Sequence, residues 1–198
     1  MWLRRLESVR GGLVGLSGSF FSARREVCQA WDIHSPSDFN TALECARQGY
    51  RAVTDPEVLG YYQDVADPSA EYRRKVRTVL RGITALRRHP DALFRVEPLF
   101  AFQLWSHKVA RWLVPWALGG LLLVSLAGAR THPLLALLLV LQLVGYGAIA
   151  AAHVVPRLRE LGPIRLAYFF VQVNLAILDA SLRALRGQSM TTWTPSRR

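Results

Sequence analysis

The sequence predicts a mixed fold: a partial α/β piece, then amphipathic interfacial helices, then an α-helical transmembrane bundle. Three observations lead to this prediction. Most of the charge lies before Arg111 and most of the apolar residues lie after it. Long apolar stretches of the kind that cross a bilayer follow that point. The first part of the chain carries one helix signal and short strand signals. The expected boundaries are 1–70, 71–108, 109–187 and 188–198.

The composition narrows the class of partner. The chain has 198 residues, is 51% hydrophobic and carries a formal net charge of +11. Nucleic-acid binding is not expected, because no helix-turn-helix, RNP-like or zinc-finger pattern accompanies the charge. Arginine beside apolar spans instead indicates attraction to anionic lipid headgroups. The two cysteines and five histidines form no metal-ligand spacing, so no protein-ligated metal is predicted.

The pattern of the N-terminal part is typical of the end of a larger α/β domain. Residues 11–19 are small and flexible, and the N-terminus lacks the sustained apolar region of a secretory signal. A helix is expected from Ser37 as N-cap, with Asp38 in its first turn and Gly49 as its stop. Residues 50–54 alternate like a strand, and 58–62 suggest a second one. About fifty residues form only a marginal independent core.

Residues 71–88 are predicted to form a basic amphipathic helix. Apolar side chains recur on one face at helical spacing, and the opposite face carries arginines. The aromatic stretch 99–105 then leads to the expected spans, near tryptophans suited to the membrane surface. The arginines of this face are Arg74, Arg77, Arg81 and Arg88.

Three membrane helices are expected, at 109–126, 133–155 and 164–182. The first two satisfy the length of about 20 apolar residues that a span needs. The third contains Gln172, Asn174 and Asp179, and polar groups are costly at membrane depth. Three spans also place a basic tail opposite the basic N-terminal part, against the positive-inside rule. A tilted or interfacial third helix is therefore the alternative.

The order of motifs resembles that of bacterial membrane-bound family 2 glycosyltransferases, which are related to cellulose and hyaluronan synthases. Each motif is short, but together they extend over nearly the whole chain. They are GLSGSFFSARRE at 15–26, SDF at 37–39, GYRAVTDPE at 49–57, EYRRKVRT at 71–78, SHKVARWLVP at 106–115 and TWTP at 192–195.

The resemblance implies that residues 1–70 are a C-terminal remnant of the family's GT-A domain. It implies sugar transfer with inversion, in which Asp38 matches the family's general base. Arg74 and Arg77 match the Gln and Arg of the family's Q-x-x-R-W motif and would bind the diphosphate, and Arg24 is assigned to the same substrate. Three other interpretations stay open. Asp38 is also favoured by the helix dipole alone, and the arginines also suit lipid phosphates. Arg24 also suits a salt bridge that braces its segment.

The sequence departs from the family in one large respect. The family holds its nucleotide sugar and a divalent Mg or Mn ion with an N-terminal sheet and a D-x-D motif, and this sequence contains no D-x-D. We therefore expect activity only when another half completes the chain, with nucleotide sugar and glycan acceptor as partners. The expected location is the bacterial cytoplasmic membrane, with multiple passes. The alternative is a non-catalytic membrane scaffold derived from such an enzyme.

Overall fold

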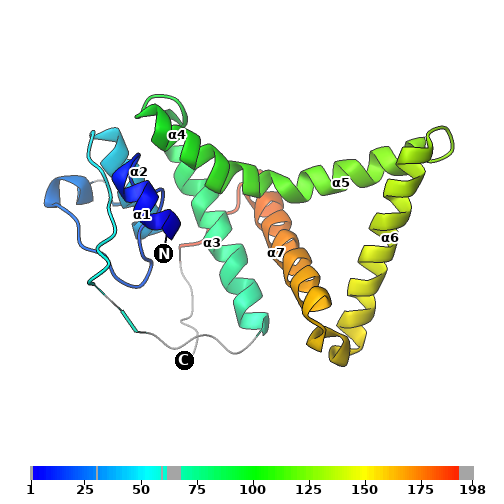
Figure 1. Ribbon diagram of the computed structural model, residues 1–198. Helices are drawn as coiled ribbons and strands as arrows, with labels where there is room; N and C mark the ends of the chain where they lie inside the picture. The colour runs from blue at the N-terminus through cyan, green and yellow to red at the C-terminus, as the bar shows by residue number, and fades with distance from the viewer. Residues whose placement is uncertain (1, 30, 59, 62–67, 192–198) are drawn as a thin grey trace. The chain divides into compact units, whose positions relative to one another are not determined.

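The computed structural model describes residues 2–29, 31–58, 60–61 and 68–191 (Figure 1). It divides the chain into two compact units. The first unit consists of Met1–Trp112 and Ala180–Arg198, and the second of Leu113–Asp179. Each unit is described by itself below.

The first unit contains a series of helices joined by extended segments. Its described helical elements are α1 (Trp2–Val9), η1 (Arg25–Cys28), α2 (Ser37–Arg47), α3 (Pro68–Arg88), η2 (Pro90–Leu93), α4 (Pro98–Leu104) and η3 (Trp105–Val109), together with the start of α5 (Ala110–Gly128) and the end of α7 (Gly162–Leu185). The element η3 is a short π-helical turn. A π turn inside a helix often marks a functional site.

The core of this unit lies where α2, α3 and α4 meet. Leu43 of α2 and Leu104 of α4 are fully buried, and Phe39 is nearly so. The side of α3 that was predicted to be apolar contributes to this protein core, since Leu80 is 1% exposed. The cluster consists of Val14, Phe39, Leu43, Ala85, Leu86, Ala92, Phe100 and Leu104.

The prediction of a partial α/β remnant is wrong for this structure, because none of the described residues forms a strand. Residues 50–54 do leave the helix, but a strand needs a neighbouring ladder of backbone hydrogen bonds. Here the Leu13 amide donates to the Ala52 carbonyl at 2.8 Å and the Thr54 amide donates to the Ser8 hydroxyl at 2.8 Å. The alternating side chains of residues 50–54 favour an extended backbone, but they do not ensure that a second strand lies beside it. The expected strand at 58–62 falls partly outside the described residues.

The C-terminal end of α2 was predicted correctly. Gly49 has a φ of +75°, a left-handed conformation that glycine adopts without steric cost. The Tyr50 amide then donates to the Cys45 carbonyl at 2.7 Å, and the Gly49 amide donates to Ala46 at 3.2 Å. These are the two hydrogen bonds of a Schellman motif, which ends the helix.

The chain has three helical segments long and apolar enough to cross a membrane, as predicted. They are Pro98–Gly128, Pro133–Val154 and Gly162–Leu185. We therefore treat it as a membrane protein. The first segment is longer than expected, because α4 continues through η3 into α5 without a break. The stretch 99–105, predicted to precede the first span, is thus part of the same helix.

The second unit comprises the rest of α5, α6 (Pro133–Val154), η4 (Pro156–Glu160) and most of α7. Polar side chains of α7 are satisfied locally: the Asn174 amide donates to the Phe170 carbonyl at 2.8 Å. The Tyr168 hydroxyl lies 2.9 Å from His153 Nδ1 and accepts from Gln172 at 3.1 Å. These hydrogen bonds satisfy polar side chains of α7 that would otherwise be unpaired in the apolar interior of a membrane.

The end of α7 belongs to the first unit, where it meets α3. Arg87 donates to the Ala184 carbonyl at 2.6 Å. A cation at the C-terminus of a helix also complements the helix dipole. The TWTP motif at 192–195 lies outside the described residues, as does most of the predicted tail.

Candidate functional site

Asp38 lies in the first turn of α2, as the sequence predicted. The preceding turn is fixed by Asp32, which accepts a hydrogen bond from the Ser35 hydroxyl at 3.0 Å. The N-cap is Pro36, with φ of −67°, so Ser37 is the first helical residue rather than the predicted cap. The start of α2 is therefore set by the preceding turn and the proline, and it presents Asp38 at the helix end that favours a negative charge.

Asp32 ties this turn to α3. Its carboxylate is ion-paired with Arg88 and also accepts from the His34 amide at 3.1 Å. Burial alone would raise the pKa of Asp32, but the His34 amide, Arg88 and Ser35 outweigh it and hold this pKa below its ordinary value. The carboxylate thus stays ionised and holds the entry to α2 in place.

The glycine segment 15–18 lies directly against Asp38. The Leu16 amide donates to the Asp38 carbonyl at 3.4 Å. A Cβ atom placed on Gly18 would stand 3.2 Å from Asp38 Oδ2, tighter than an ordinary van der Waals contact. Glycine at this position therefore lets the backbone approach the carboxylate closely.

Lys108 approaches the same segment from η3. Its Nζ lies 4.9 Å from the centre of the Phe39 ring, a cation–π contact. The same atom would stand 3.5 Å from a Cβ on Gly15. A carboxylate and an ammonium therefore border opposite ends of one glycine segment.

A close contact between Glu7 and His107 joins α1 to η3. Glu7 is 7% exposed, and its Oε1 lies 2.7 Å from His107 Nδ1. Gly11 follows, where an added Cβ would meet the Gln103 side chain at 2.6 Å. Because His107 and Gln103 belong to the helix that enters the first candidate span, these contacts fix the N-terminal segment to the start of that span.

Arg74 and Arg77 lie on α3, and a later turn of this helix contacts the turn before α2. Arg74 pairs with Glu71 at 2.7 Å. One turn past Arg77, Arg81 donates to the Ser35 carbonyl at 2.7 Å. Burial lowers the pKa of Arg77, and the charges of Arg81 and Arg74 lower it further. Arg74, Arg77 and Arg81 thus place positive charge along one stretch of α3.

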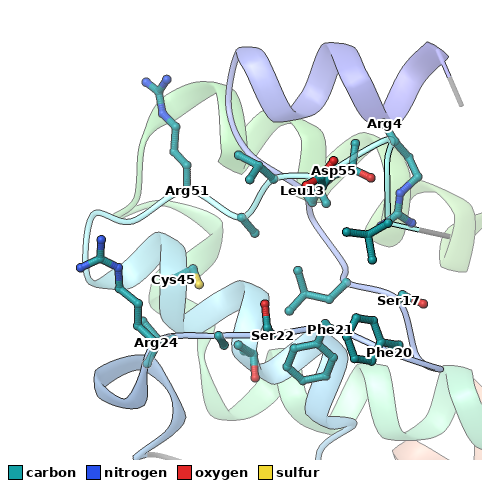
Figure 2. Close-up of a pocket in the computed structure, with 18 of the residues that line it drawn as sticks. Arg4, Leu13, Ser17, Phe20, Phe21, Ser22, Arg24, Cys45, Arg51 and Asp55 are labelled. Carbon is teal, nitrogen blue, oxygen red and sulfur yellow. The ribbon is translucent and has the colours of Figure 1, made fainter. Parts of the chain in front are cut away.

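Arg24 lies in a different environment. It stacks over the Tyr50 ring at 5.6 Å and lines a cavity of about 590 Å³ between segments 13–24 and 50–58. Figure 2 shows Phe20 and Phe21 on one side of this cavity and Leu13 and Asp55 on the other. The described lining includes neither Asp38 nor the arginines of α3.

The structure therefore brings the predicted site residues together only in part. Asp38 meets the glycine segment, and Arg81, one turn past Arg77, donates to the Ser35 carbonyl before Asp38. Arg74 pairs instead with Glu71 on its own helix. Arg24 faces the separate cavity. Lys108 and Glu7 were missed as parts of a site, although Lys108 lies within the SHKVARWLVP motif. Only the fold shows that Lys108 packs against Phe39 of α2 and that Glu7 contacts the neighbouring His107.

The expected divalent metal has no set of ligands here. Among the described residues, no three His, Cys, Asp or Glu side chains gather into a group that fits a metal ion. The donor set of the described chain therefore does not fit the ion, and no chemical step below passes through one.

Comparison of the chain with family models, with curated proteins and with solved structures finds no match. The resemblance therefore rests on the motifs and their order.

Proposed function

We propose that this chain is the C-terminal portion of a membrane-bound glycosyltransferase acting at the bacterial cytoplasmic membrane in polysaccharide synthesis. It would transfer a sugar from a nucleotide-sugar donor to a glycan or a lipid-linked acceptor. One observation carries the proposal. Asp38, the residue that matches the family's base, lies in the first turn of α2 against a glycine segment, and Lys108, within the candidate span Pro98–Gly128, borders the same segment.

The chemistry assigned to Asp38 is that of a general base. Its carboxylate takes the proton of the acceptor hydroxyl while the acceptor oxygen bonds to the anomeric carbon. The bond from that carbon to the donor phosphate breaks, and its electron pair leaves with the nucleoside diphosphate. Attack opposite the leaving group inverts the anomeric carbon. A base of this kind must lie within hydrogen-bond reach of the proton.

The α3 arginines suit the leaving group. Charge develops on the diphosphate as the glycosidic bond to it breaks, and positioned guanidinium groups stabilise such charge. Arg74 and Arg77 lie on the helix that Arg81 ties to the entry of α2. We assign the cavity near Arg24 to a contact with the nucleotide-sugar donor or with the N-terminal half that binds this donor.

The experiment is a transfer assay in vesicles with radiolabelled nucleotide sugars. The chain is co-expressed with the nucleotide-binding N-terminal half of a membrane glycosyltransferase, and each part is also expressed alone. The proposal predicts labelled glycan or lipid product from the pair and from neither part alone. Membrane insertion and association of the pair, without product from any donor, would support the non-catalytic scaffold instead.

A further inference from the structure

Helix α1 turns its apolar face away from the protein. Trp2 is 75% exposed, Val9 is 72% exposed, and Leu3 and Leu6 are also exposed. Trp2, Leu6 and Val9 fall within one narrow sector at 100° per residue, with Leu3 at its edge. Such a face on a short amphipathic helix needs an apolar environment.

The opposite side of α1 is fixed to the protein, so its rotation is determined. Glu7 is buried against His107. The Ser8 hydroxyl accepts a hydrogen bond from the Thr54 amide at 2.8 Å. With these two residues held inward, the sector containing Leu6 points outward.

The contact with His107 also places α1 at the depth of the membrane surface. His107 lies in η3, inside the continuous helical segment Pro98–Gly128 that forms the first candidate span. Trp105 lies two residues before it and is exposed, and tryptophans collect at the headgroup level of a bilayer. A helix pinned to His107 therefore lies near the headgroups.

The charges of α1 match an anionic surface. The exposed Arg5 belongs to the helix, and the exposed Arg10 directly follows it. Basic side chains beside an exposed apolar face are typical of helices that lie in the interface of anionic bilayers.

We propose that α1 is an interfacial anchor, whose outward face of Trp2, Leu3, Leu6 and Val9 inserts among the lipid headgroups of an anionic bilayer. The anchor fixes the glycine segment that follows it to the membrane surface. The proposal stands on the contacts of α1 alone and does not depend on sugar transfer.

The test is a scan of α1 with a fluorescent label in the full chain. In a background with Cys28→Ser and Cys45→Ala, single cysteines replace Trp2, Leu3, Arg5, Leu6, Ser8 and Val9 in turn. Each carries NBD and is reconstituted in vesicles of phosphatidylcholine with phosphatidylglycerol. We expect lipid-borne nitroxide to quench labels at positions 2, 6 and 9 strongly and the label at 8 weakly. Aqueous iodide should have little effect at 2, 6 and 9.

Two outcomes overturn the proposal. Strong iodide quenching at 6 and 9 places the face in water, and quenching by neither agent places it against protein, such as a second copy of the chain. Wild-type protein supplies a measurement free of labels: brominated lipid should lower its tryptophan fluorescence more than that of Trp2→Phe. Equal losses in both proteins contradict insertion. Arg5→Gln with Arg10→Gln should weaken lipid quenching at position 6 when phosphatidylglycerol is present.

Discussion

Each of the two units contains a polar cluster, and the two clusters differ in what their charged groups contact. In the second unit, Arg159 stacks 4.4 Å over the Tyr168 ring and donates to carbonyls at the end of α6, while Tyr168 bonds both His153 and Gln172. That cluster is satisfied by its own members. In the first unit, Asp38 and Lys108 face a bare glycine segment. We therefore expect the second cluster to stabilise the fold, whereas the first is the cluster in which we have proposed ligand binding.

The largest expected effect separates protein packing from lipid exposure. Leu43→Ala empties a fully buried position in the core of the first unit, and should lower the free energy of unfolding by about 2–5 kcal/mol. Leu141→Ala is the matched control, because this α6 side chain is 59% exposed in the protein. It should change stability by less than about 1 kcal/mol. Denaturant unfolding in mild detergent, followed by circular dichroism, measures both, and equal losses would contradict the packing described.

The next effect concerns the glycine segment. Gly18→Ala places a Cβ 3.2 Å from Asp38 Oδ2 and should displace that carboxylate. We expect about a tenfold lower rate of sugar transfer in the co-expression assay, since small misplacements at a reacting group are costly. Gly15→Ala is the control, because its Cβ makes an ordinary 3.5 Å contact with Lys108. Similar rates for the two variants would show that Gly18 does not position Asp38.

The satisfied cluster of the second unit should matter for stability alone. Tyr168→Phe removes the hydroxyl shared by His153 and Gln172, and should cost about 1 kcal/mol. Tyr146→Phe in α6 is the control and should cost less. Thermal unfolding in detergent measures the difference. Loss of transfer activity in Tyr168→Phe at unchanged stability would break the distinction between the two clusters.

The smallest effect is a pH dependence from Asp32. The pKa of Asp32 is lowered in the folded protein. Its contribution to the free energy of unfolding is therefore complete above pH 3.8, the ordinary pKa of the group, and is lost as the pH falls through the lower pKa of the folded state. At neutral pH, Asp32→Asn should cost about 0.5–1 kcal/mol, a small value because Arg88 is largely exposed. The difference in the free energy of unfolding between wild type and Asp32→Asn should shrink at acid pH. A gap that stays constant down to the acid transition would exclude this ion pair as its source.

Local signals predicted much of the fold. The apolar runs predicted the three long helices, and the Asp38 and Gly49 positions predicted where α2 begins and ends. The strand at 50–54 was wrong, because alternation reports propensity and not the presence of a partner strand. The continuity of Pro98–Gly128 was also missed, since the polar residues 106–108 looked like a break and are instead accommodated by the π turn η3.

The sequence could predict only those site residues that lie in a recognisable motif. Asp38 and the α3 arginines stood out by motif position. Lys108 and Glu7 did not, because their contacts join residues 69 and 100 positions apart in the sequence, which no local period encodes. Arg24 was grouped with the α3 arginines by function, whereas the fold places it over Tyr50 beside the cavity.

The most direct test of the central claim is the transfer rate of Asp38→Asn beside that of Glu57→Gln in the co-expression assay. Both changes replace an acid by its amide, and Glu57 is exposed in the turn after residue 54. The account predicts that Asp38→Asn lowers transfer by at least about 100-fold, the contribution of a general base, while Glu57→Gln leaves it unchanged. Full activity in Asp38→Asn, with the protein folded and inserted, would contradict the claim that this carboxylate is the base.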